Sequence, residues 1–343
     1  MIITSIDELP AALAASLSAE ERALCQKLKS SPFHLAVSSH FASLAAPERD
    51  DPIRRQFMPD PLEDAADPFA LDDPLGEDRY RVTSRLVHQY RDRALLLAGG
   101  PCAGYCRYCF RRARMNAGFI SSAELQPALA YLESSPGIRE LLVSGGDPLT
   151  ADDEKLKELF GKLRKARPDI FIRLCSRVPV TEPKRLKSQT IDLLGSFKPL
   201  RLVTHINHAR ELSPEAQAAL ASLVEAGIPV HVQTVLLKGI NDNAETLAML
   251  FRECLNLGIT PYYIFQLDLA PGTAHFRVPL RKGLAIYREL ERQISGLALP
   301  AYAVDLPGGG GKIRLSEDII AGEKDGVFLL KDCDGKLWKY PAG

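Results

Sequence analysis

Apolar and polar positions alternate in a regular way from residue 94 onward. Six short runs dominated by Leu, Ile and Val cover residues 94–99, 140–146, 170–176, 200–205, 229–237 and 262–268. Longer amphipathic stretches separate them. Strands and helices that alternate at roughly 30-residue spacing indicate right-handed βαβ units around a parallel sheet. Six units are fewer than the eight of a closed barrel. The pattern therefore predicts an α/β protein with a partial (β/α)6 barrel.

Capping residues mark several of the predicted helix starts. A Ser or Asp followed three residues later by Glu satisfies free backbone donors of the first turn, and Pro suits the first helical position. The three predicted starts are Ser121 with Glu124, Ser213 before Pro214, and Asp242 with Glu245.

The region before the barrel reads as helical and irregular. Within it, the acidic and Pro-containing stretch 50–78 could be a linker or an ordered belt wrapped on a core. Spaced apolar residues favour the belt, namely Phe57, Met58, Phe69 and Leu71. The organisation we expect is an N-terminal extension over residues 1–85, a core over 86–296 and a C-terminal segment over 297–343.

Composition and charge exclude several classes of partner. Lys+Arg and Asp+Glu balance at 43 each, which argues against nucleic acid or an anionic membrane as the main partner. No apolar run approaches the ~20 residues that a membrane-spanning helix needs. The N-terminus lacks a basic region followed by an apolar core, so it is a poor signal peptide. We expect a cytoplasmic protein.

Polar residues collect where the predicted strands end. In barrel-type α/β folds, the C-terminal strand ends and the loops after them build the active site. The residues at these ends are Ser144-Gly145-Gly146-Asp147, Ser176-Arg177, His205 with Asn207, Gln233 and Asp268. The sequence thus predicts that these polar residues gather at one end of the barrel, called its mouth, where we expect the active site.

Three of the seven cysteines, Cys102, Cys106 and Cys109, form a Cys-x3-Cys-x2-Cys motif directly after the first barrel strand. Three thiolates can bind three irons of a [4Fe–4S] cube and leave the fourth iron open to a small chelator. A structural zinc site usually needs a second Cys-x2-Cys arm, which does not follow, and a disulfide would leave one cysteine over. The motif predicts a radical S-adenosylmethionine (SAM) enzyme. The other cysteines are expected to be small hydrophobic residues: Cys25, Cys175, Cys254 and Cys333.

The run PGGGGK at residues 307–312 resembles a phosphate-binding loop only superficially. The Walker pattern needs glycine where Leu306 stands and Ser or Thr where Ile313 stands. A flexible turn that delivers Lys312 to the barrel mouth suits a lysine that forms a Schiff base with pyridoxal phosphate (PLP). A solvated lysine on a surface turn is the alternative.

Several motifs together resemble the lysine 2,3-aminomutase family. They lie at residues 88–93, 102–112, 144–149, 204–208, 232–242, 268–277 and 304–312. The resemblance implies an isomerase that converts L-α-lysine to β-lysine through a 5′-deoxyadenosyl radical acting on a PLP aldimine. It also implies a [4Fe–4S] cluster, SAM and PLP as cofactors, and an electron donor such as flavodoxin or ferredoxin. A homo-oligomer is left open.

Charged residues near the mouth point to the substrate. Arg111 follows the cluster motif and can hold a carboxylate bidentately, whereas two acids suit an ammonium group. Taken singly, Asp268 and Asp305 could equally be cap or turn residues. The resemblance implies that Lys312 binds PLP, that Arg111 holds the α-carboxylate and that the two acids hold the side-chain ammonium of lysine. An acidic substrate tail would be repelled, so lysine is favoured over glutamate.

The resemblance assigns further cofactor contacts. It implies that SAM is held by Gly145, Gly146, Asp147, His205 and Gln233. It implies that Tyr90 and Arg93 hold PLP and its phosphate. The alternatives are surface positions on a helix for Tyr90 and Arg93, and satisfied polar groups of the core for His205 and Gln233.

Two features depart from the family pattern. Gln89 stands where many relatives carry Arg, so part of the phosphate contact could be weaker or come from elsewhere. The cysteine-rich zinc-binding tail of longer relatives does not follow, and Asn243 replaces the remaining zinc cysteine, so we expect no zinc. The resemblance also leaves open a branch that makes (R)-β-lysine for elongation factor P, or another amino acid as substrate.

Overall fold

The computed structural model describes residues 1–31, 33–112, 118–316, 320–324, 327–331 and 335–341. Cys333, expected to be a lone hydrophobic cysteine, lies outside the described residues.

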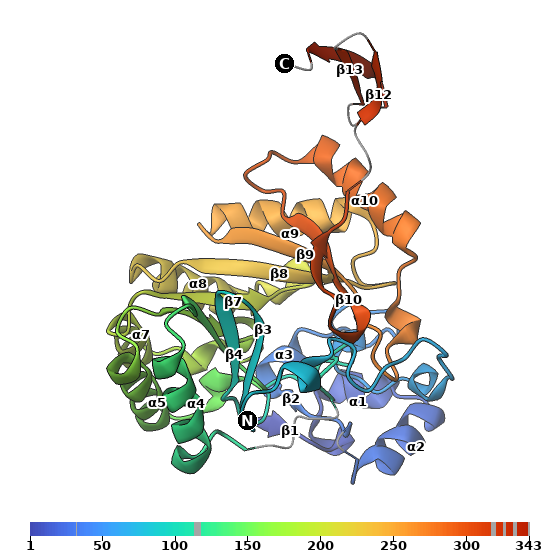
Figure 1. Ribbon diagram of the computed structural model, residues 1–343. Coiled ribbons are helices and arrows are strands. Elements are labelled where there is room, and N and C mark those ends of the chain that lie inside the picture. Colours follow the sequence, from blue (N-terminus) through green and yellow to red (C-terminus); the bar gives the residue numbers. More distant parts are fainter. Residues whose placement is uncertain (32, 113–117, 317–319, 325–326, 332–334, 342–343) are drawn as a thin grey trace.

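A nine-stranded sheet forms the centre of the molecule (Figure 1). Its order is β11-β10-β9-β8-β7-β6-β5-β4-β3, and the strands from β4 to β10 are parallel. The strands are β3 (Leu86–Tyr90), β4 (Arg93–Leu97), β5 (Glu140–Ser144), β6 (Phe171–Cys175), β7 (Leu200–His205), β8 (Val230–Leu236), β9 (Thr260–Gln266), β10 (Ala301–Leu306) and β11 (Gly311–Arg314). The six predicted strands are confirmed as β4 to β9. Three strands were not predicted, namely β10, which is parallel to β9, and the edge strands β3 and β11, which are antiparallel to their neighbours.

Helices pack their apolar sides on this sheet. They are α4 (Ser122–Ser134), α5 (Asp153–Ala166), α6 (Val178–Thr181), α7 (Ser188–Gly195), α8 (Pro214–Glu225), α9 (Ala244–Asn256) and α10 (Leu280–Gln293). One continuous core of buried Leu, Ile, Val and Phe side chains joins sheet and helices. The (β/α) alternation of the sequence therefore gives the expected partial barrel.

Two of the three predicted helix starts are confirmed. Ser121 makes the capping box of α4 with Glu124, and Ser213 caps α8. The prediction for Asp242 is wrong, because Asn243 caps α9 by accepting from the backbone of Thr246. Asp242 instead accepts from the backbone N–H of Gly239 and pairs with Lys282, which fixes the turn before the helix.

The N-terminal extension has a small core of its own. It contains β1 (Ile2–Ile3), α1 (Ala11–Ser16), α2 (Ala19–Leu28), β2 (Val37–Ser38), α3 (Ser39–Ser43) and the 3-10 helices η2 (Arg54–Gln56), η3 (Pro61–Asp64) and η4 (Glu77–Tyr80). The stretch 50–78 is an ordered belt. Phe57 and Met58 are buried, but Phe69 is 65% exposed and does not anchor it. Buried ion pairs anchor the belt, since Glu63 bonds both Arg107, within the cysteine motif, and Arg112, just after it.

The C-terminal segment contributes two separate pieces. Strands β10 and β11 form a hairpin that continues the main sheet, and the glycine run lies at its turn. A second, three-stranded sheet follows from β12 (Ile320–Lys324), β13 (Val327–Lys331) and β14 (Leu337–Pro341). In Figure 1 this small sheet stands away from the barrel. Over the described ranges, the helices are all too short or too polar to cross a membrane.

Candidate active site

One cavity of about 570 Å³ lies at the mouth of the barrel. Asn207, expected at the same mouth, is buried and does not line it. The residues predicted to hold a cofactor or the substrate all line it, although they come from many segments of the chain. They are Tyr90, Arg93, Cys102, Cys106, Cys109, Arg111, Gly145, Gly146, Asp147, His205, Gln233, Asp268, Asp305 and Lys312. The structure therefore brings the cysteine motif and the lysine of the glycine run to the same space.

The cysteine loop packs against the glycines that follow β5. A Cβ on Gly146 would lie 1.7 Å from the carbonyl oxygen of Gly100 and 3.6 Å from Sγ of Cys102. Gly145 has a φ of 120°, which L side chains rarely adopt. The two glycines are needed because the backbone after β5 runs directly beside the loop that carries the thiols.

Three thiols on one loop, all facing one cavity, are a suitable donor set for three irons of a cube. In the part of the chain that the structure describes, no three His, Cys, Asp or Glu side chains converge as ligands of a single metal ion would. Thiolates that each bind a different iron need not converge on one point. The arrangement of Cys102, Cys106 and Cys109 fits a cluster.

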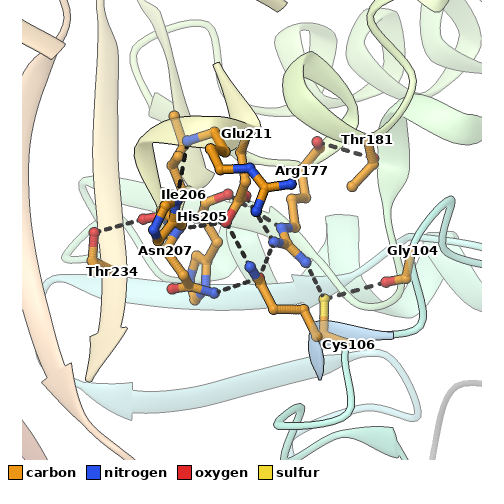
Figure 2. Close-up of polar contacts among 12 residues, drawn as sticks. Gly104, Cys106, Arg177, Thr181, His205, Ile206, Asn207, Glu211 and Thr234 are labelled. Atoms are coloured by element: carbon orange, nitrogen blue, oxygen red, sulfur yellow. Dashed lines mark hydrogen bonds and ion pairs between the residues drawn. The ribbon is translucent and has the colours of Figure 1, made fainter. Parts of the chain in front are cut away.

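Arg177, at the end of β6, is the centre of a buried polar network (Figure 2). Its Nη1 donates to Sγ of Cys106 at 2.8 Å, and its Nη2 donates to Oε2 of Glu211 at 2.8 Å. Gln56 of the N-terminal extension also accepts from Arg177 and donates to Glu211. Both charges are buried and paired, which is the condition under which buried ions are tolerated. The network fixes the position of Cys106 relative to the barrel.

Asp147 is held where β5 ends. Its side chain accepts from the backbone N–H groups of Leu149 at 3.0 Å and Arg177 at 2.7 Å. Burial raises the pKa of Asp147 to about 6 despite these bonds. This carboxylate is therefore a rigid acceptor at the mouth.

His205, the last residue of β7, pairs in register with Gln233, which lies in the middle of β8 and not at its end as predicted. Their side chains form a hydrogen bond between Nε2 and Oε1 at 3.0 Å. Burial lowers the pKa of His205 to about 4, so the ring is neutral at pH 7. The two side chains satisfy each other's hydrogen-bonding capacity and also face the cavity. They are therefore paired polar groups that remain available to a ligand.

Lys312 projects from β11 into the cavity. It lies opposite Asp305 in the register of the hairpin, and its Nζ is 3.3 Å from Oδ2 of that residue. Its Nζ also lies 3.9 Å from the centre of the Phe265 ring. Burial lowers the pKa of Lys312. A lysine with a lowered pKa is a better nucleophile toward a carbonyl, and the interpretation as a solvated surface lysine is wrong.

Tyr90 and Arg93 flank the lysine. The Tyr90 hydroxyl accepts from the backbone N–H of Lys312 at 3.0 Å, and the Arg93 guanidinium lies 3.8 Å from the centre of the Tyr90 ring. They belong to the β3–β4 hairpin, so their interpretation as helix-surface residues is wrong. Gln89, on the same hairpin, donates to the carbonyl oxygen of Gly309 at 3.1 Å and thus holds the glycine turn.

Two acids face the cavity close to Lys312. Burial, and after it the negative charge of Asp305, raise the pKa of Asp268 to about 7. A carboxyl group whose ionisation is disfavoured by burial and by a neighbouring negative charge gains from a bound cation.

Three charged residues of the cavity were not predicted. Glu77 forms an ion pair with Arg111, and Arg173 donates from Nε to Glu140 at 2.8 Å. Arg173 and Glu140 are polar positions within apolar runs, and that interruption was the available signal. Glu77 carries no such signal, because its partner lies 34 residues away in sequence.

The fold and the cysteine loop define the class of protein. Residues 99–251 match the family model described as the Radical SAM superfamily. The chain is 43% identical to "Putative L-lysine 2,3-aminomutase" of Treponema pallidum (strain Nichols), over 93% of this chain and 90% of that protein. It is 35% identical to the L-lysine 2,3-aminomutase of Clostridium subterminale, over 94% of this chain and 77% of that protein. It is 32% identical to the glutamate 2,3-aminomutase of Clostridioides difficile (strain 630), over 98% of this chain and 80% of that protein.

The chain therefore belongs to the lysine 2,3-aminomutase family of radical SAM enzymes. It is an enzyme of the isomerase class, and membership in the superfamily implies SAM and a [4Fe–4S] cluster.

Proposed function

We propose that the protein is an L-lysine 2,3-aminomutase, which converts L-α-lysine to β-lysine. The observation that carries the proposal is the charge pattern of one cavity, with a basic group for a carboxylate, two acids for an ammonium and a lysine with a lowered pKa. A diamino acid complements this pattern at each of its charged groups.

Cys102, Cys106 and Cys109 would hold the cluster, and Gly145, Gly146, Asp147, His205 and Gln233 would contact SAM. Asp147 would accept from the amino group of SAM. The neutral His205 adds no charge beside a sulfonium. When bound, the cluster and SAM supply the radical that removes a hydrogen atom, and PLP supplies the carbonyl and the conjugated ring.

Lys312 is the residue that would hold PLP covalently, because it is the lysine that faces the cavity with a lowered pKa. Asp305 accepts from its ammonium group in the resting protein and can take part in its deprotonation. Tyr90 fixes the backbone of Lys312, and Arg93 offers a cation for the phosphate of PLP.

Asp268 and Asp305 would accept from the side-chain ammonium of lysine, and Arg111 would hold its α-carboxylate. A substrate with an acidic tail would meet two carboxyl groups instead, and like charges at this distance repel. We therefore favour lysine over the glutamate used by the relative of Clostridioides difficile. Whether β-lysine is released free or supplied as the (R) form for elongation factor P is a second question, which product handedness answers.

The test is anaerobic reconstitution of the protein with iron, sulfide and PLP, followed by incubation with SAM, a chemical reductant and one amino acid. We expect L-lysine to give β-lysine and L-glutamate to give no β-glutamate, as measured by chiral chromatography. β-Glutamate formed faster than β-lysine would refute the lysine assignment. Flavodoxin or ferredoxin as donor, and a cytoplasmic location, belong to the same proposal.

A further inference from the structure

The N-terminal extension reaches the glycine turn that carries Lys312. The backbone N–H of Gly308 donates to the carbonyl of Pro74 at 3.0 Å. Arg79 donates from Nη1 to the carbonyl of Gly308 at 3.0 Å, and the Tyr80 hydroxyl donates to the carbonyl of Gly309 at 3.0 Å. Three bonds thus connect residues 74–80 to a turn more than 220 positions later in the chain.

Backbone packing at Gly76 makes this contact tight. Gly76 has a φ of 63°, and a Cβ there would lie 2.7 Å from both the carbonyl carbon of Gly308 and the nitrogen of Gly309. Any side chain would push the two segments apart. Because Glu77 is the next residue, its position is set by the glycine turn.

Glu77 in turn holds Arg111. Its carboxylate accepts from Nε and Nη2 of the guanidinium, and its side chain is only 7% exposed. The Arg111 guanidinium also lies 4.5 Å from the centre of the Phe110 ring. One edge of the guanidinium is therefore occupied by the protein's own carboxylate, and a ligand would meet the group from the side of Nη1.

The same belt contacts the loop that follows Asp268. The backbone N–H of Leu71 donates to the carbonyl of Leu269 at 2.8 Å, and Asp67 pairs with Arg277. Residues 67–80 therefore contact all three pieces that carry the proposed substrate groups, namely the Asp268 loop, the Lys312 turn and Arg111.

We propose that Glu77 is a positioning and specificity-determining residue for the α-carboxylate of the substrate. It fixes the orientation of the Arg111 guanidinium, and the belt sets the position of that guanidinium relative to Lys312. This inference rests on the proposed function. Glu77 lines the same cavity, but it would act on the substrate through Arg111 and not by direct contact.

The physical reason lies in the freedom of the arginine side chain. A long side chain that must be ordered by the ligand weakens binding, whereas one already held by a second carboxylate binds without that loss. Two planar groups also recognise each other through paired hydrogen bonds only at a defined angle. Without Glu77, Arg111 keeps its charge but loses this angle.

The test compares the binding of L-lysine and of L-lysinamide, which differs by the loss of the carboxylate charge. PLP-loaded, cluster-reconstituted protein is titrated with each amine in the absence of reductant, and the change in PLP absorbance gives both dissociation constants. We expect the wild-type protein to bind L-lysine at least about tenfold more tightly than L-lysinamide, which equals 1.4 kcal/mol. In Glu77→Ala this preference should fall below about threefold, because the carboxylate contact loses its fixed partner.

Two further variants complete the design. Asp78→Ala removes the neighbouring acid, whose side chain is 59% exposed and pairs with Arg81, and should keep the wild-type preference. Glu77→Gln keeps one oxygen acceptor for Arg111 and should give an intermediate preference. If Glu77→Ala does not fold, the preference measured for Glu77→Gln tests the role of Glu77 instead.

The outcomes separate the two proposals. A wild-type protein that does not prefer L-lysine would overturn the proposed function, whatever the variants show. A wild-type protein with the preference, together with Glu77 variants that keep it in full, would overturn the role of Glu77 alone. A loss of preference in Asp78→Ala as large as in Glu77→Ala would also overturn it, because the effect would then belong to the belt in general.

Discussion

The cavity is lined by two sets of residues that differ in how their charges are balanced. Around the cysteines, each buried ion named above has a partner, as in the network of Arg177, Glu211 and Gln56. Around Lys312, burial and the negative charge of Asp305 raise the pKa of Asp268 to about 7. The charges of Arg177 and Glu211 are balanced within the protein, whereas the acids near Lys312 gain stability when a cation enters. One part of the site is thus built for rigidity and the other for binding.

The largest expected effect tests whether the two sets act independently. Lys312→Ala removes the covalent attachment of PLP, so formation of β-lysine should fall by at least about a thousandfold. Borohydride treatment should then fix no PLP to the protein. The iron content and the cluster absorbance should stay at the wild-type level, because the three thiols that would bind the irons are unchanged.

Lys157→Ala is the matched control for that experiment, since Lys157 is exposed on α5. It should behave as the wild type in all three measurements. Full β-lysine production by Lys312→Ala would exclude the lysine as the PLP anchor.

The next effect concerns folding rather than activity. Glu211→Ala leaves the buried Arg177 charge without its partner, which should lower the free energy of unfolding by about 3–5 kcal/mol. Asp242→Ala breaks a more exposed pair with Lys282 and should cost at most about 1 kcal/mol. Urea denaturation followed by circular dichroism measures both. Equal losses of unfolding free energy in the two variants would contradict the rigidity assigned to the residues around the cysteines.

A variant near Lys312 should weaken substrate binding without lowering stability. Asp268→Asn removes an acid that resists ionisation, so the unfolding midpoint at pH 8 should be no lower than that of the wild type. The KM for L-lysine should nevertheless rise by at least about tenfold, because one charged acceptor of the ammonium is lost. Steady-state kinetics at saturating SAM gives the KM. An unchanged KM would remove Asp268 from the substrate site.

The smallest effect is a shift of pH dependence. Asp268, with a pKa near 7, is protonated below that pH and loses the charge that attracts an ammonium. The KM for L-lysine should therefore rise as the pH falls through about 7. Asp305→Asn removes one cause of the raised pKa, so the rise should move to lower pH. A rise that moves to higher pH in this variant would contradict the coupling of the two acids.

The cysteine side could be predicted from the sequence because its signals are local. The apolar runs gave strands β4 to β9, and the spacing of the three cysteines gave the loop. The substrate side was only partly predictable. Tyr90 ends β3, a short strand that becomes polar after its first two residues, and β11 is mostly glycine and polar residues.

Two other features were not predicted because each depends on a contact between residues far apart in the sequence. Glu77 could not be assigned because its role depends on a contact with Arg111 that only the folded belt creates. The start of α9 was placed one residue too early because Asp242 and Asn243 are both good caps, and the ion pair with Lys282 decides between them. Local rules name candidates, and long-range contacts choose among them.

The hairpin register of β10 and β11 has a consequence for how the chain can vary. Asp305 lies directly opposite Lys312, and alternate residues of a strand point to opposite faces. Removing one glycine from the run would place the lysine opposite Leu306 and turn its side chain away from the cavity. The glycines therefore act as a counted spacer. A change of one in their number would disable the site as surely as the loss of the lysine, with every functional residue still in the sequence.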